Sequence, residues 1–161
     1  LMKTYIGIKK IQATPMTRGN YNKYRHWDIP KNENPSDEGY LVLYEDGYES
    51  WSPKEVFEKA YREIDEQGLS FGEAIECLKN GLKVARSGWN GKGMFLYLVK
   101  GVTIPKTSLR NEAAKAIDIL EQNETVIINS HIDMKAADGS IVIGWLASQT
   151  DMLANDWIVV N

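Results

Sequence analysis

The sequence predicts an α+β fold, in which small antiparallel sheets are combined with short helices. Two Asp-Gly dipeptides, at 46–47 and 138–139, each lie between extended runs, which is a strong signal for a hairpin with a type I′ turn. Ser70 and Glu73 form a capping box in front of an amphipathic run. These signals predict a small hairpin-helix unit over residues 1–66 and a second unit over residues 69–161.

In the first unit, residues 3–14 alternate loosely and suit a strand that Pro15 closes. A short helix over 17–27 and an exposed, proline-containing loop over 28–37 come before the first hairpin, whose strands are 40–44 and 48–51. Ser52 is the expected N-cap of the next helix, with Pro53 at its first position and Glu55 in its first turn. The apolar face of this helix is expected to comprise Val56, Phe57, Ala60, Tyr61 and Ile64.

The second unit is expected to contain a small antiparallel sheet, the capped helix and an inserted helix. The capped helix buries a stripe and ends at Gly81, which takes the left-handed cap. Strands are expected at 83–87, at 94–99 (ending by Thr103 to Pro105), at 125–129, on both sides of the second Asp-Gly turn, and at 157–160. The residues expected to be buried are Phe71, Ala74, Ile75, Leu78, Ile141, Val142, Ile143, Leu153 and Trp157; Leu109, Ala113, Ala116, Ile117 and Leu120 define the inserted helix, which ends near Asn123.

Composition excludes several classes of function. The net charge of −3 and the lack of a basic stripe argue against binding to long nucleic acid, whose affinity depends on phosphate neutralisation. No run of about 18 apolar residues is present, so we expect neither a membrane span nor a secretory signal. Cys77 is the single cysteine, which fits a reducing compartment and predicts no internal disulfide.

Two stretches carry chemistry that suits a small ligand. Residues 86–99 place Trp89 and Lys92 on a glycine-punctuated turn, where main-chain N–H groups could hold a phosphate. Residues 131–157 place Trp145 before a run of short polar side chains. A tight hairpin with a polar loop would use the same residues, so the structural interpretation stays open. Asp151 either caps the following short helix or contacts the ligand.

His131 and Asp133 share one strand face and are the best candidates for catalysis. Two such groups are too few for a zinc site, and no set of nucleophile, base and orienting group can be assembled from the sequence. We therefore predict no catalytic residues, no metal and no cofactor. Ligand binding by His131, a structural role and acid–base catalysis all remain open at this stage.

Three blocks resemble a known family. GWNGKGMFLYL (88–98), SHIDMKAADGSIV (130–142) and WLASQTDMLANDW (145–157) are together similar to the phage-encoded Thoeris anti-defence sponge family, the second described. The resemblance implies a non-enzymatic homotetramer that sequesters glycocyclic ADP-ribose in pockets between subunits, in the cytoplasm of the infected bacterial host. Some relatives also resemble binders of the cyclic dinucleotides of CBASS systems, at separate sites.

On this basis we expect three kinds of ligand contact. Trp89, Phe95 and Trp145 would stack on bases or line the pocket, and hydrogen bonds would come from Asn90, Ser148, Gln149 and Thr150. The main chain near Gly91 would meet the phosphates together with Lys92, aided by His131 or Lys135.

Two features depart from the family pattern, since residues 1–68 precede the family blocks and the helix over 107–122 is longer than usual. The leading segments TPMTRGNYNKYR and GYESWSPKEVF resemble stretches of other phage proteins without an assigned function. Two alternatives remain: an enzyme that hydrolyses a nucleotide signal with His131 and Asp133, and a protein–protein adaptor.

Overall fold

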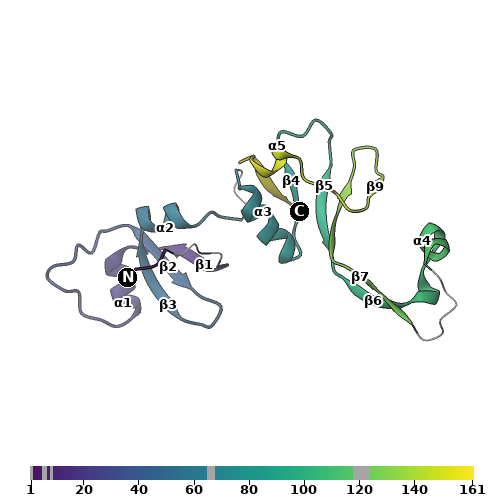
Figure 1. The fold of residues 1–161 in the computed structure, drawn as a ribbon. Coiled ribbons are helices and arrows are strands. Elements are labelled where there is room, and N and C mark those ends of the chain that lie inside the picture. The colour runs from purple at the N-terminus through teal and green to yellow at the C-terminus, as the bar shows by residue number, and fades with distance from the viewer. Residues whose placement is uncertain (1, 5–6, 8, 65–67, 118–123) are drawn as a thin grey trace. The chain divides into compact units, whose positions relative to one another are not determined.

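The computed structural model of the protein describes residues 2–4, 7, 9–64, 68–117 and 124–161. The chain forms two compact units, Leu1–Glu63 and Ile64–Asn161 (Figure 1). Residues 65–67 of the predicted linker lie outside the described residues. The α+β class is confirmed, because each unit combines short helices with antiparallel strands. None of the described helices has the length and apolar character that a membrane span requires.

The first unit is built on a three-stranded antiparallel sheet. Its strands are β1 (Gln12–Pro15), β2 (Gly39–Leu43) and β3 (Glu49–Pro53), in the order β1-β2-β3. Helix α1 (Arg18–Tyr24) lies between β1 and β2 in sequence, and α2 (Lys54–Ala60) follows β3 directly. The predicted hairpin and the helix carrying Tyr21 and Tyr24 are confirmed, whereas the first strand is shorter than expected.

The segment that begins at Thr17, TRGNYNKYR, has a structural role in this unit. Thr17 caps α1, and the Arg18 guanidinium donates to Glu33, which also accepts from the side chain of buried Asn22 at 3.0 Å. A Cβ on Gly19 would lie 2.6 Å from the Cβ of Pro35. The motif therefore ties α1 to the proline-containing loop, which explains why a polar stretch lies in a buried place.

Two expectations for α2 were wrong. Ser52 belongs to β3, and Pro53 occupies the N-cap without a side-chain hydrogen bond, because the strand runs straight into the helix. Val56 is exposed, and Ile64 packs on the core of the second unit. The face that does pack is aromatic: Phe57 stacks on Tyr40 with ring centroids 4.2 Å apart.

The second unit contains a five-stranded antiparallel sheet with the order β10-β4-β5-β8-β9. The strands are β4 (Lys83–Arg86), β5 (Phe95–Val99), β8 (His131–Lys135), β9 (Ile141–Val142) and β10 (Trp157–Val160). Helix α3 (Phe71–Lys79) packs on β4, β5 and β10. Trp157, Leu78, Leu96 and Val84 are fully buried between them and form the centre of the core.

Helix α3 follows the sequence prediction closely. Ser70 and Glu73 make the reciprocal capping box, and Ala74 and Leu78 of the predicted stripe are buried. Gly81 has a φ of 82°, as the predicted left-handed cap requires. The core role of Trp157 is likewise confirmed. Leu153 is 77% exposed, so its assignment to the core was wrong.

A two-stranded arm of β6 (Val102–Pro105) and β7 (Thr125–Ile128) extends the second unit. Residues 102–105 thus form a separate strand rather than the end of β5. Between β6 and β7 lie a 3-10 turn, η1 (Lys106–Ser108), and α4 (Asn111–Ala116). The expected helix is shorter, because Leu109 lies before it and Ile117 is already extended. Leu120 and the predicted end near Asn123 lie outside the described residues.

Both Asp-Gly hairpins form, but with a different turn. Gly47 and Gly139 have positive φ, at 82° and 91°, while Asp46 and Asp138 do not, so neither turn is type I′. The Gly139 N–H donates to the Ala136 carbonyl at 3.0 Å, and the Ala136 N–H donates to the Ser140 carbonyl. This is the three-residue loop in which a glycine closes a bulge.

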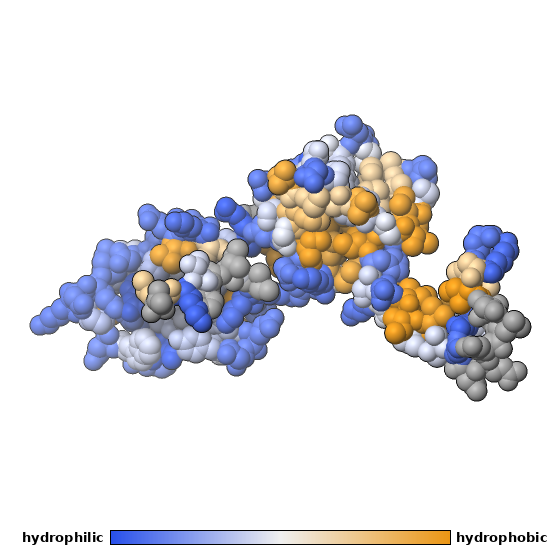
Figure 2. All heavy atoms as spheres, viewed as in Figure 1, coloured by the Kyte–Doolittle hydropathy of each residue, from blue (hydrophilic) through white to orange (hydrophobic). Residues whose placement is uncertain are grey.

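The expectation that residues 141–143 form a buried strand was wrong. β9 is only two residues long and lies at the edge of the sheet, so its outer side has no neighbouring strand. Ile141, Val142 and Ile143 are 50%, 44% and 76% exposed. Figure 2 shows apolar side chains gathered over the second unit, at the side where β9 lies and along the β6–β7 arm.

Candidate functional site

The five-stranded sheet presents two chemically different faces. Leu96 pairs with Met134 and Val84, and all three are buried on the side of α3. Because side chains alternate along a strand, their neighbours point to the opposite face. That second face, called here the Phe95 face, carries Lys83, Phe95, Tyr97, His131, Asp133 and Lys135.

Phe95 lies between two lysines on this face. The Nζ atom of Lys83 is 5.3 Å from the centroid of the Phe95 ring. Lys135 is the register partner of Phe95, and its Nζ donates to the Gly93 carbonyl at 3.1 Å. Tyr97 follows on the same strand, with its ring centroid 6.2 Å from that of Phe95. An aromatic ring flanked by cations is an arrangement that can bind a planar anion.

The predicted His131 and Asp133 pair is brought together farther along the same face, where Asp133 is the register partner of Tyr97. His131 Nε2 lies 3.5 Å from Asp133 Oδ1, and its Nδ1 lies 2.8 Å from the Asn129 carbonyl oxygen. Asp133 is 5% exposed and also accepts from the Gly144 N–H at 3.0 Å and from the Tyr97 hydroxyl at 3.4 Å. Burial and the Asp133 charge raise the pKa of Tyr97, so its hydroxyl keeps its proton and remains a donor.

The tryptophans predicted to stack on a base lie on the other side of the sheet. The ring centroids of Trp89 and Trp145 are 5.6 and 6.3 Å from that of Trp157, and 6.3 Å from each other. Both rings are partly buried and pack against the core. The main-chain N–H of Trp145 donates to the Ile132 carbonyl at 2.7 Å, so the chain after β9 keeps a hydrogen bond to β8. The structure therefore brings Trp89 and Trp145 together, and the two rings and Trp157 pack edge to face against one another.

The polar run at 148–150 opens a short helix, α5 (Gln149–Met152). Ser148 is its N-cap and forms a capping box with Asp151, so Asp151 takes part in capping from inside the helix rather than as the cap of a helix that follows it. The Ser148 hydroxyl is engaged in that box, while Gln149 and Thr150 are exposed in the first turn.

The sequence interpretation missed Arg86, which connects this helix to the glycine loop. Its guanidinium donates to Asp156 at 2.7 Å and to Asp151 at 2.9 Å. Asp156 also accepts from the Gly88 N–H at 3.0 Å, and Asp151 accepts from the Trp89 indole at 3.3 Å. The signal that could have identified it is a lone arginine at the end of a buried strand, since such a cation requires buried partners.

The Arg86 network shifts the pKa values of its members. Partial burial raises the pKa of Asp151, but hydrogen bonds from Ser148 and Arg86 outweigh it and lower the pKa to about 2. The hydrogen bond from Arg86 likewise lowers the pKa of Asp156, and the two carboxylates raise the pKa of Arg86. All three groups therefore stay charged at neutral pH.

The glycine loop was expected to hold phosphates through its main-chain N–H groups. The Gly88 N–H is already occupied by Asp156. A Cβ on Gly91 would lie 2.2 Å from Met94 Sδ and 2.9 Å from the Ala137 Cβ, so this glycine permits close packing. Asn90 and Lys92 are exposed at the tip of the loop.

The predicted site residues thus form two groups. Trp89, Asn90, Gly91, Lys92, Trp145, Ser148, Gln149 and Thr150 belong to the glycine loop and to the segment around α5, whereas Phe95, His131 and Lys135 lie on the Phe95 face. The Lys135 contact with Gly93 connects the two groups. Among the described residues, no cluster of three or more His, Cys, Asp and Glu side chains could hold a metal ion.

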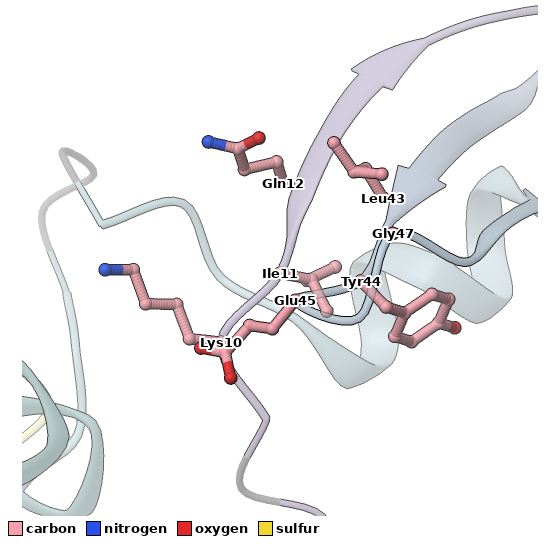
Figure 3. A pocket seen from close by; sticks show the side chains of 7 residues that line it. All are labelled: Lys10, Ile11, Gln12, Leu43, Tyr44, Glu45 and Gly47. Carbon is pink, nitrogen blue, oxygen red and sulfur yellow. The ribbon is translucent and has the colours of Figure 1, made fainter.

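A pocket of about 420 Å³ lies elsewhere, in the first unit (Figure 3). Its lining comes from the segment that leads into β1 and from the β2–β3 turn, and includes Lys10, Gln12, Tyr44 and Glu45. None of the predicted site residues lines it. The sequence carried no signal for it, because its residues belong to two segments that only the sheet brings together.

Comparison with known proteins places the second unit in a family. Residues 69–160 match the family model of the Thoeris anti-defense 2-like domain. The protein Thoeris anti-defense 2 of Bacillus phage SP01 is 42% identical over 93 residues, which cover 58% of this chain and 96% of that protein. The matched segment contains the whole five-stranded sheet, its helix α3 and the β6–β7 arm. The chain therefore belongs to the Thoeris anti-defense 2-like family.

Proposed function

We propose that the protein is a phage anti-defence protein that binds a cyclic nucleotide immune signal and sequesters it without cleaving it. The observation that carries the proposal is the match to almost the full length of a Thoeris anti-defense 2 protein. Glycocyclic ADP-ribose is the first ligand we propose, and the cyclic dinucleotides of CBASS systems are the second. The site of action is the cytoplasm of the infected host.

The residues proposed to contact the ligand remain those of the two groups described above. Phe95, Trp89 and Trp145 offer aromatic surface, and Asn90, Ser148, Gln149 and Thr150 offer hydrogen bonds. Lys92, Lys135, His131 and the main chain at Gly91 are the proposed phosphate contacts. The exposed side chains of Asn90, Lys92, Gln149 and Thr150 support this assignment best, because they can meet a ligand without rearrangement.

Binding alone is strong enough for sequestration. Stacking of a base on an aromatic ring contributes roughly 1–3 kcal/mol. A nucleotide of about 35 heavy atoms at roughly −0.3 kcal/mol per atom reaches about −10 kcal/mol, which corresponds to a Kd of tens of nanomolar.

We further propose a homotetramer with ligand pockets between subunits. The exposed apolar side chains that follow the second hairpin support a subunit interface: Ile141, Val142, Ile143, Leu146 and Leu153. Apolar side chains gathered on the surface near β9 (Figure 2) are unusual on a protein that stays monomeric. Pockets between subunits would also let residues of the two groups meet across the interface, although they lie on opposite faces within one subunit.

The test is to incubate the protein, with both units present, with glycocyclic ADP-ribose, remove free ligand by filtration, and heat the retained protein. We expect depletion of the nucleotide from the filtrate and its release, unchanged in mass, after denaturation. Recovery of a hydrolysed nucleotide that His131→Ala prevents would instead establish the enzyme. The same experiment, repeated with cyclic dinucleotides, would favour an adaptor if nothing in the panel is retained.

A further inference from the structure

The Phe95 face contains a cation to which neither the fold nor the proposed site assigns a role. Lys83 lies at the start of β4, next to buried Val84, so its side chain points to the same face as Phe95 and Tyr97. Its Nζ rests 5.3 Å from the Phe95 ring centroid. Lys135 is the register partner of Phe95 on β8, the strand on the other side of β5, and its Nζ donates to the Gly93 carbonyl.

In the described part of the chain these two lysines form no close ion pair, although Lys135 and Asp138 attract each other electrostatically. Within the described residues, neither Lys83 nor Lys135 has a carboxylate oxygen within the 4.0 Å of an ion pair. Asp133, the acidic residue of this face, is already occupied by Gly144, Tyr97 and His131. An ammonium has three N–H donors; Lys135 uses one of them on the Gly93 carbonyl, and the Lys83 ammonium lies against the Phe95 ring. Both groups thus retain donors and charge for an anion.

The chemistry of the two lysines favours a small anion as the group that they contact directly. The cores of protein–protein interfaces are depleted in lysine, because its ammonium is costly to desolvate. Of the apolar side chains proposed for subunit contact, Ile141 lies at the edge of this face opposite Lys135, whereas Leu146 and Leu153 come after β9. Since a cation–π contact at a partly exposed site is weak, the Lys83 ammonium can turn from the ring to a phosphate oxygen at little cost.

We propose that Lys83 is a further ligand-binding residue, which acts with Lys135 to hold the phosphate groups of the nucleotide while the freed Phe95 ring stacks on its base. Tyr97 is then placed to donate to a ribose hydroxyl beside the ring. This inference rests on the proposed function and adds to it a phosphate contact on the Phe95 face.

The test compares Lys83→Gln with Lys100→Gln, because both remove one positive charge from the second unit and Lys100 is exposed just after β5. The Kd for glycocyclic ADP-ribose is measured by calorimetry at low and at high salt. We expect Lys83→Gln to weaken binding roughly tenfold or more, as loss of a charge-assisted hydrogen bond does. Its affinity should also fall less with salt than that of the wild type, because one screened contact is gone. Lys100→Gln should bind within about twofold of the wild type.

Lys83→Arg keeps the positive charge but changes the shape of the side chain. It should therefore retain most of the affinity and salt dependence that Lys83→Gln loses. Melting temperatures of all variants should match, since Lys83 makes no ion pair among the described residues. If Lys83→Gln binds like Lys100→Gln, the inference is overturned while the proposed function stands. If the wild-type protein binds neither this nucleotide nor a cyclic dinucleotide, the proposed function itself fails, and the inference with it.

Discussion

Removing the guanidinium of Arg86 should destabilise the second unit more than any other single charge deletion there. Arg86→Met keeps much of the aliphatic stem but removes the cation that Asp151 and Asp156 share. Both carboxylates then lose the hydrogen bonds that the guanidinium donates. The side chains of Arg86, Asp151 and Asp156 are only 15%, 13% and 31% exposed, so water replaces the lost bonds incompletely. The loss should therefore exceed that of an ordinary surface ion pair.

The magnitude follows from the contacts. Arg86 makes close bonds to two carboxylates, at 2.7 and 2.9 Å, and hydrogen bonds to charged groups contribute about 1.5–3 kcal/mol each when shielded. Solvent screening at this partly exposed position reduces the sum to about 2 kcal/mol. For a unit of fewer than 100 residues, a loss of that size lowers Tm by roughly 10 °C.

The assay is thermal unfolding followed by near-ultraviolet circular dichroism, which reports the packing of Trp89 on Trp157 directly. Arg110→Met is the matched control, because Arg110 is exposed and its side chain bonds to carbonyl groups. Asp156→Asn added to Arg86→Met should recover part of the loss, since an unpaired carboxylate is then removed. A melting temperature of Arg86→Met within about 2 °C of the control would refute this account.

Three further predictions concern pH, packing and assembly. The pKa of Asp151 is lowered to about 2 in the folded protein, so its contribution to stability is present above pH 4 and lost as the pH falls toward 2; acid titration of Asp151→Asn should lack this part of the loss. Trp89→Ala should lower the stability of the second unit by about 2 kcal/mol, less than a fully buried ring would cost, and a denaturant titration with an unchanged midpoint would contradict its packing on Trp157. Ile143→Ser combined with Leu146→Ser should shift the protein toward monomer in size-exclusion chromatography with light scattering, whereas the same elution as the wild type would remove these side chains from the interface.

Local signals predicted the elements that depend on neighbouring residues. The capping box of Ser70 and Glu73 and the left-handed Gly81 are interactions across a few residues, and they form as expected. Both Asp-Gly hairpins also form, with a turn other than the predicted type I′. Ser52 shows the limit of the same rule, because pairing with Tyr40 keeps it in β3. A long-range strand pairing overrode a good N-cap.

The candidate site depended more on tertiary structure than on sequence. The spacing of His131 and Asp133 on one strand face predicted their approach. No spacing indicated that Trp89 and Trp145 would meet around Trp157, since the three rings come from separate strands and loops. Their packing was decided by where the sheet order places β4 and β10.

The sequence by itself determined the short-range structures and the family membership of residues 69–160. Both depend on residues that are close together in the chain. What only the tertiary structure decided is which side chains share a face and which are covered. Ile141 and Ile143 are as apolar as a core strand, yet the sheet ends at β9 and leaves them exposed. The burial of a strand depends on whether another strand or a helix covers it. Arg86 likewise has two carboxylate partners because residues about 65–70 positions away fold back beside it.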